Sequence, residues 1–152
     1  MPDFSHLLRK PAGMALPPPV LMAAWYPGII RAWSVGENQN KNAYVRFQLG
    51  LSGWPDNVPE ERRFAKDKDG KPTDQHIDLS KKQFRRDFYL TDDALIYLDD
   101  LIRSCGIEPN GEPYEVILPN LIGANVLVEV TEQVSERTGS MVNYVNGVKG
   151  QQ

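Results

Sequence analysis

The stretch FRRDFYLTDDALIYLDDLIRSCGI, residues 84–107, changes from a strand pattern to a helix pattern near its middle. In its first part Phe84, Phe88 and Leu90 share one face of an alternating pattern, which is typical of a half-buried strand. Arg86 falls on the same face, and we expect it to lie near a strand end and to reach solvent. The stretch therefore predicts a strand that leads directly into a helix.

The helix is predicted over about residues 91–105. Leucine and isoleucine recur there at intervals of three and four, which places an apolar stripe on one side. Thr91 is expected to cap the first turn, because its hydroxyl can accept a hydrogen bond from an unpaired amide. Gly106 is expected to end the helix in a left-handed conformation. Tyr97 is expected to pack, with its hydroxyl at the rim.

Two further strands are predicted before this stretch. WYPGIIRAWSV (25–35) is rich in aromatic and β-branched residues, and AYVRFQLGLSG (43–53) alternates apolar and polar side chains. In the first strand Ile30 and Ala32 are expected to face inward and Trp33 outward. The polar tract ENQNKN between the two strands is typical of a turn. The inward face of the second strand is expected to consist of Val45, Phe47, Leu49 and Leu51.

Two more strands are predicted after the helix, in LPNLIGANVLVEVTEQV (118–134) and MVNYVNGVKG (141–150), with a turn at SERTGS between them. Between the second and third strands, residues 53–76 hold prolines, glycine and many charges, and they predict one long loop. The inward residues of the fourth strand are expected to be Val126, Val128 and Val130. The order is three strands, one helix and two strands, which indicates a mainly β fold.

Residues 1–24 predict a proline-rich arm ahead of one domain at 25–150. The PPP run in this arm favours an extended polyproline segment. The arm is too apolar to be a comfortable free tail, so we expect it to pack on its own domain or on a neighbouring one.

Compartment signals favour a soluble cytoplasmic protein. Asp3 and the prolines argue against a signal peptide, and no window approaches the about 20 apolar residues of a membrane span. The only cysteine, Cys105, permits no internal disulfide, which fits a reducing cytoplasm.

Charge is unevenly distributed along the chain, whose formal net charge is −3. Residues 61–86 carry nine basic and five acidic side chains, whereas residues 87–152 carry three and eleven. Such asymmetry creates a local positive surface even on an acidic protein. Contact with phosphates is therefore expected in the middle of the chain, although two solvated faces of opposite sign would explain the same distribution.

Sequence motifs for catalysis and for metal or phosphate binding are missing. The two histidines, His6 and His76, have no second ligand at the spacing of a metal site. Gly70-Lys71 has neither the preceding glycine nor the following hydroxyl residue of a phosphate-binding loop, and there is no GxSxG. We therefore expect no enzymatic activity and no cofactor.

The element order, with the helix between the third and fourth strands, is that of an OB-fold, a five-stranded Greek-key barrel. The segments YPGIIRAW, NAYVRFQLGLSG, FRRDFYLTDDALIYLDDLIRSCGI, LIGANVLVEVTEQV and NYVNGV, within residues 25–148, resemble a family of phage-encoded proteins related to single-stranded-DNA-binding proteins. The resemblance implies an OB-like barrel and single-strand binding in phage replication or recombination, in the cytoplasm of an infected or lysogenic bacterial host. RNA, a second copy of the chain, and phage replication or recombination proteins are further candidate partners, and no membrane is expected.

A single-strand binder without sequence preference needs cations for phosphates and aromatic faces on which bases stack. Each of the first three predicted strands has one basic and one aromatic side chain on its outward face. These candidates are Arg31, Trp33, Tyr44, Arg46, Arg85 and Tyr89. Lysines that would track the phosphate backbone are Lys66, Lys68, Lys71, Lys81 and Lys82. Alternatively, the rings cover the far side of the barrel and the lysines only solvate a loop.

The alternative function is a protein-interaction or oligomerisation module with an OB-like barrel and no nucleic-acid role. Its groove or its prolyl arm would then dock a partner protein. Phosphate contacts make affinity fall steeply with salt, whereas an apolar interface is much less sensitive, so the salt dependence of binding separates the two functions. Trp54 also has two interpretations, because it either pins the base of the long loop or stacks on a base.

Overall fold

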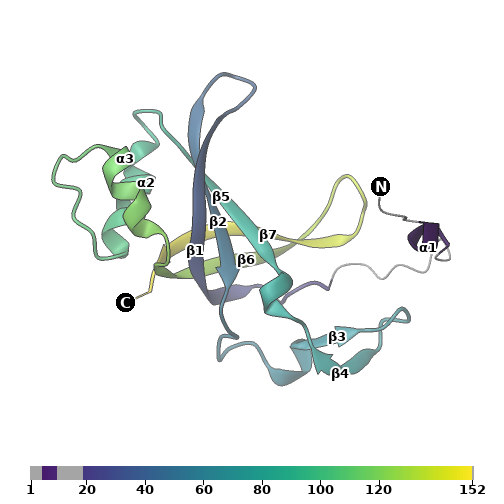
Figure 1. Cartoon of the computed structure of the whole chain (residues 1–152). Coiled ribbons are helices and arrows are strands. Elements are labelled where there is room, and N and C mark those ends of the chain that lie inside the picture. The colour runs from purple at the N-terminus through teal and green to yellow at the C-terminus, as the bar shows by residue number, and fades with distance from the viewer. Residues whose placement is uncertain (1–4, 10–18, 152) are drawn as a thin grey trace.

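The computed structural model describes residues 5–9 and 19–151, and it is mainly β (Figure 1). Most of the predicted arm, residues 1–4 and 10–18, lies outside the described residues. The strands are β1 (Ala24–Glu37), β2 (Ala43–Leu51), β3 (Phe64–Lys66), β4 (Pro72–His76), β5 (Gln83–Tyr89), β6 (Asn125–Val134) and β7 (Met141–Gly150). The helices are α1 (Ser5–Leu8), α2 (Leu95–Ser104) and α3 (Tyr114–Ile117), with 3-10 turns η1 (Glu60–Arg62), η2 (Leu79–Lys81) and η3 (Leu118–Leu121).

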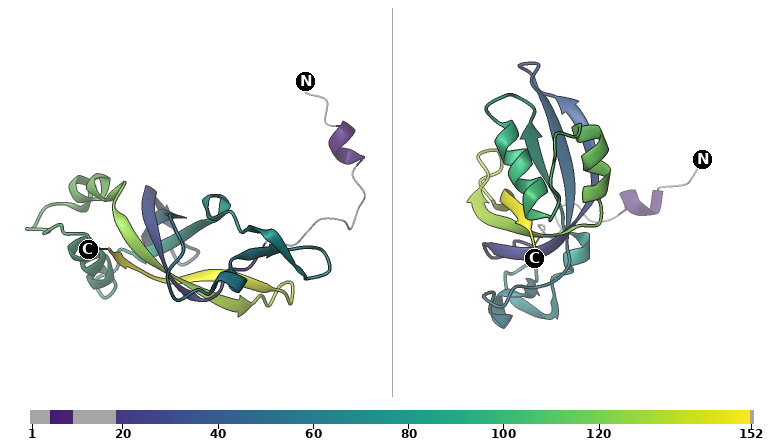
Figure 2. Two further views of the ribbon diagram at one scale, coloured as in Figure 1. Left: turned by 90° about the horizontal axis from the view of Figure 1, so that it is seen from below. Right: turned by 90° about the vertical axis from the view of Figure 1, so that its left-hand side faces the viewer.

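Five strands form one antiparallel sheet in the order β5-β2-β1-β6-β7. The long strand β1 lies at its centre and pairs with β6 through its first half and with β2 through its second. The sheet curls, as the two views of Figure 2 show, and its edge strands β5 and β7 approach within 8 Å at their Cα atoms. α2 follows β5 in the chain and packs against both edge strands.

The hydrophobic core gathers on the inner face of this sheet and against α2. All the residues that were predicted to face inward from the second and fourth strands are buried in it. Phe88 of β5 is also buried, and Phe84 and Leu90 pack against the same core. The predicted facing of β2, β5 and β6 is therefore confirmed.

A β-bulge in β1 overturns the predicted facing of Trp33 and Ala32. Arg31 is the extra residue at which the register between β1 and β2 shifts, and beyond a bulge the alternation of side chains reverses. Trp33, which was predicted to face outward, lies opposite inward-facing Phe47 and packs against the core. Ala32, which was predicted to face inward, lies opposite the exposed Gln48.

The helix α2 begins later than predicted. Thr91 does not cap it, because the N-cap position is occupied by Ala94 and no side chain caps the first turn. The carbonyl of Thr91 accepts backbone hydrogen bonds from Ala94 and Leu95, both at 3.0 Å. These bonds form a turn that redirects the chain after β5, and the helix begins only at Leu95. At the other end Gly106 has φ +83°, which confirms the predicted left-handed stop.

The segment predicted as one loop, residues 53–76, contains a separate two-stranded hairpin of β3 and β4. Aromatic rings pack at the base of this hairpin, with the ring centre of His76 4.7 Å from that of Phe64 and 6.2 Å from that of Trp54. Trp54 also meets the core residue Tyr26 at 5.9 Å between ring centres. These contacts favour the interpretation in which Trp54 pins the base of the segment.

The end of the predicted arm, residues 19–23, packs against the main sheet. Leu21 is fully buried in the core. Its backbone N–H donates to Oδ1 of Asn143 at 2.8 Å, and its carbonyl accepts from Nδ2 of the same side chain at 2.9 Å. The amide of Asn143 therefore takes the place of a strand partner for Leu21.

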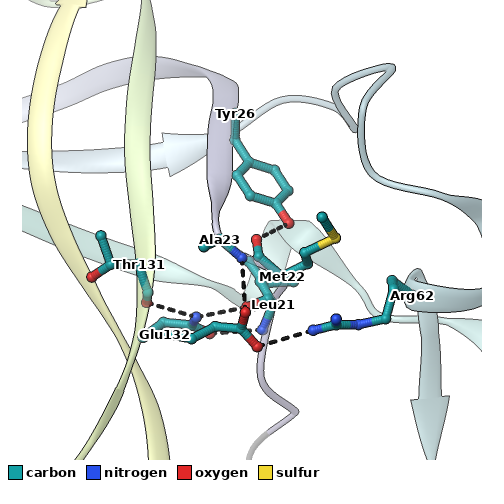
Figure 3. A network of polar contacts seen from close by, with 8 residues as sticks. Leu21, Met22, Ala23, Tyr26, Arg62, Thr131 and Glu132 are labelled. Carbon is teal, nitrogen blue, oxygen red and sulfur yellow. Dashed lines mark hydrogen bonds and ion pairs between the residues drawn. The ribbon is translucent and has the colours of Figure 1, made fainter.

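A polar network joins this segment to the region before β3 (Figure 3). The carboxylate of Glu132 accepts from the backbone N–H of Ala23 at 3.2 Å and pairs with Nη2 of Arg62 at 2.9 Å. The hydroxyl of Tyr26 donates to the carbonyl of Met22 at 2.8 Å. Burial raises the pKa of Tyr26 to about 12, so this phenol keeps its proton and its hydrogen bond at neutral pH.

Replacing Asn143 by alanine is expected to lower the free energy of unfolding by about 1–3 kcal/mol, because both backbone groups of Leu21 lose their partner. Urea unfolding followed by circular dichroism measures this change. The matched control is Asn146→Ala, since the Asn146 amide bonds to the side chain of Glu129 at 2.9 Å in an exposed position. Equal losses in the two variants would contradict the anchoring role of Asn143.

Candidate nucleic-acid interface

A groove of about 610 Å³ lies on the outward side of β2 and β5 and reaches β7. Three arginines line it, Arg31 from β1, Arg46 from β2 and Arg85 from β5. Tyr144 of β7 also lines the groove. Gln48, Gln83 and Asn143 add uncharged polar groups to the lining. The groove therefore combines a concentration of positive charge with one aromatic ring.

The register of β2 against β5 explains why these side chains share one face. In an antiparallel pair, directly opposed residues point to the same side of the sheet. The opposed pairs on this face are Tyr44–Tyr89, Arg46–Asp87 and Gln48–Arg85. The outward sets predicted for these two strands are thus brought together.

The three groove arginines differ in whether their guanidinium group forms an ion pair. Arg46 makes a two-pronged ion pair with Asp87, with Nε–Oδ1 at 2.7 Å and Nη2–Oδ2 at 3.0 Å. The hydrogen bond to Asp87 raises the pKa of Arg46 and fixes its guanidinium. Arg31 and Arg85 are exposed, and neither forms an ion pair with the rest of the described chain. Arg31 and Arg85 are therefore the two groove cations whose charge is available to a ligand.

Two glycines let large side chains lie close to the sheet. A Cβ on Gly50 of β2 would collide with the guanidinium of Arg31. A Cβ on Gly36 of β1 would come within 2.6 Å of the hydroxyl of Tyr44. The bare backbone at these two positions therefore allows Arg31 and Tyr44 to lie across the sheet instead of projecting away from it.

Next to the groove, Tyr44 and Tyr89 form an edge-to-face pair, with ring centres 5.9 Å apart. The guanidinium carbon of Arg46 lies 5.0 Å from the ring centre of Tyr44. Tyr89 remains 38% exposed. The cation and the two rings thus form a connected row, which continues the positive lining of the groove. Trp33 does not belong to it, because the bulge turns that ring toward the core.

The structure places the predicted lysines elsewhere. Lys66, Lys68 and Lys71 are exposed on the β3–β4 hairpin, which is a separate sheet, and none of them lines the groove. Lys81 is exposed at the end of η2, just before β5. Lys82 donates to the carbonyl of Pro19, and burial lowers its pKa. Lys82 therefore holds residues 19–23 in place.

Sequence reasoning missed the contribution of β7. Tyr144 lines the groove and is 47% exposed, yet it lies more than fifty positions after Arg85, the nearest groove arginine in the chain. The available signal was the element order itself. In an OB-like arrangement the third and fifth strands adjoin, which places the predicted strand at 141–150 beside the one at 80–90.

Other reactive groups do not gather into a second chemical centre. No three His, Cys, Asp or Glu side chains come together as metal ligands would within residues 5–9 and 19–151. Cys105 is half-buried, and burial raises the pKa of its thiol, which disfavours the reactive thiolate.

No protein-family model matches the chain, and no curated protein matches it in sequence. None of the helices that the structure describes is long and apolar enough to cross a membrane.

Proposed function

We propose that this protein binds single-stranded DNA, largely without sequence preference, in the groove between β2, β5 and β7. The observation that carries the proposal is the meeting of Arg31, Arg46 and Arg85 with Tyr144 around one groove. Guanidinium groups bind phosphates, and exposed rings stack on bases of any identity. Such a surface suits a strand whose bases are unpaired, since a duplex keeps its bases stacked inside.

An OB-like barrel is the fold that we propose for the domain. The sheet order β5-β2-β1-β6-β7, the position of α2 between β5 and β6, and the approach of the two edge strands all support it. OB-folds bind oligonucleotides on the face of their second and third strands, which correspond here to β2 and β5. The groove lies on that face.

We further propose a role in phage replication or recombination, in the cytoplasm of the bacterial host. The proposal draws on the resemblance of residues 25–148 to phage single-strand binders. The strand would be DNA exposed during those processes, with RNA as a second ligand class. Binding itself would require no cofactor, because charge and stacking suffice.

A protein-interaction module is the second candidate function. Apolar side chains exposed outside the groove favour it, including Ile96 of α2 at 58% exposure and Val116 of α3 at 51%. Exposed apolar surface can mark contact with a protein or with a second copy of the chain. Such contact would be compatible with strand binding, since neither side chain lines the groove.

A salt titration of binding to fluorescent oligo(dT) tests the proposed function. If the two groove arginines without an ion pair, Arg31 and Arg85, each contact one phosphate, log K should fall against log salt concentration with a slope of about −1.4. Duplex DNA of equal length, as the control, is expected to bind more weakly at every salt concentration. Absence of oligo(dT) binding at about 50 mM salt, where phosphate contacts are strong, would favour the interaction module instead.

A further inference from the structure

A second cavity, of about 570 Å³, lies between β5, α2 and β7. Aromatic side chains on its wall are Tyr89 of β5 and Tyr97 of α2. Its cations are Arg86 and Lys149, and its carboxylates are Asp87 and Asp100. Asp87 is already neutralised by Arg46. Tyr97, which was predicted to pack, is instead 64% exposed. The cavity therefore has an exposed aromatic ring, that of Tyr97, and a cation, Arg86, on its wall.

Arg86 is the unusual member of this wall. It lies opposite Phe47 on the inner face of the sheet, where the other side chains of β5 are apolar. Its Nε is buried and has no hydrogen-bond partner among the residues that the structure describes. Its guanidinium carbon is 6.0 Å from the ring centre of Phe88, and Arg86 forms no ion pair within residues 5–9 and 19–151. A buried donor without a partner destabilises a fold, and such departures are found at functional sites. Arg86 also lines the cavity, where its charge can serve a ligand.

The cavity and the groove adjoin along the line where β5 and β7 approach each other, which we call the seam. The groove is lined by residues 83–85 of β5 and 143–145 of β7. The cavity is lined by the residues that follow in the same two strands, 86–89 and 147–149. A row of contacts also connects them, because Arg46 lines the groove and lies over Tyr44, and Tyr44 touches Tyr89 on the cavity wall. A strand that leaves the groove along this seam enters the cavity.

We propose that this cavity is an end subsite for the bound single strand. Arg86 binds a phosphate of the strand, and the adjoining base stacks on Tyr97. Lys149, on the β7 side of the cavity, lies 4.5 Å from the ring centre of Trp25 and adds positive charge to that wall. This inference rests on the proposed function and extends the binding site from the outward face of the sheet to α2.

Two variants and two lengths of oligo(dT) test the subsite. An oligomer of about 4 nucleotides fills the groove alone, whereas one of about 12 also reaches the cavity. Arg86→Met and Tyr97→Ala are each expected to weaken binding of the longer oligomer about tenfold and to leave the shorter one unchanged. Arg86→Met should also raise the urea midpoint or leave it unchanged, because it removes a buried Nε that has no partner among the described residues and keeps an apolar chain of similar length.

The control is Arg103→Met, because Arg103 is exposed on α2 and does not line the cavity. Unchanged binding of the longer oligomer in both variants would overturn the subsite while the groove proposal stands. An acidic peptide that binds the wild-type protein in an Arg86-dependent way, with oligomer affinity unaffected, would overturn it in favour of a protein ligand. If the wild-type protein binds neither oligomer, both proposals fall. Tyr97→Ala keeps the subsite testable if Arg86→Met does not fold.

Discussion

The double variant Arg31→Ala/Arg85→Ala is expected to bind oligo(dT) about 100-fold more weakly than the wild-type protein at low salt. These are the two groove arginines without an ion pair among the described residues, so their charges are available to phosphate. Arg46 remains in the variant, but its guanidinium is held by Asp87. Removing both of these phosphate contacts should also reduce the steepness of the salt dependence by about 1.4 units of slope.

Fluorescence anisotropy with labelled oligo(dT), repeated over a salt series, measures both effects. The matched control is Arg103→Ala/Arg137→Ala, which removes the same net charge at two exposed positions outside the groove. The control should lose little affinity, because only long-range attraction is weakened. Similar losses in the two double variants would show that binding depends on net charge rather than on the groove.

Replacing Phe47 by alanine is expected to lower the free energy of unfolding by about 3–5 kcal/mol. Phe47 is fully buried and packs edge-to-face on Phe88 at 5.7 Å between ring centres. It also lies between Trp33 and Arg86 in the neighbouring strands. The substitution leaves a cavity at the junction of three strands. This loss is a large part of the about 5–15 kcal/mol by which domains are stable.

Urea unfolding followed by tryptophan fluorescence measures this loss. Val35→Ala is the control, since Val35 lies in β1 but is 61% exposed, and its truncation should change stability by less than about 0.5 kcal/mol. A loss below about 1 kcal/mol for Phe47→Ala would contradict the placement of this ring at the centre of the core.

The facing of β2, β5 and β6 could be predicted from the sequence because a regular strand repeats every two residues. The facing of Trp33 could not be predicted, because one extra residue at Arg31 reverses the alternation beyond it. The order of apolar and polar residues in β1 does not reveal this bulge. A bulge is fixed by the partner strand, which needs Trp33 opposite Phe47 in the core. Local alternation in β1 holds no information about that pairing.

The candidate site was predictable in part for the same reason. Tyr44, Arg46 and Arg85 follow from strand alternation and adjacent pairing, both of which are local. Tyr144 depends on how the curled sheet brings its last strand beside β5, which is a long-range property. Lys66, Lys68 and Lys71 failed to join the groove because residues 64–76 form their own hairpin. Composition indicated positive charge there, but charge alone does not determine which sheet carries it.

The central position of β1 has a consequence for how the protein is made. Its second half can pair with β2 across a short turn soon after both have been synthesised. Its first half must wait for β6, since Ala24 pairs with Val130. Until residues 125–130 have left the ribosome, the first half of β1 has no strand partner on that edge, and such edges promote aggregation. Folding is therefore expected to be limited by closure of this long-range pair, and nascent chains truncated before residue 125 should depend most on chaperones.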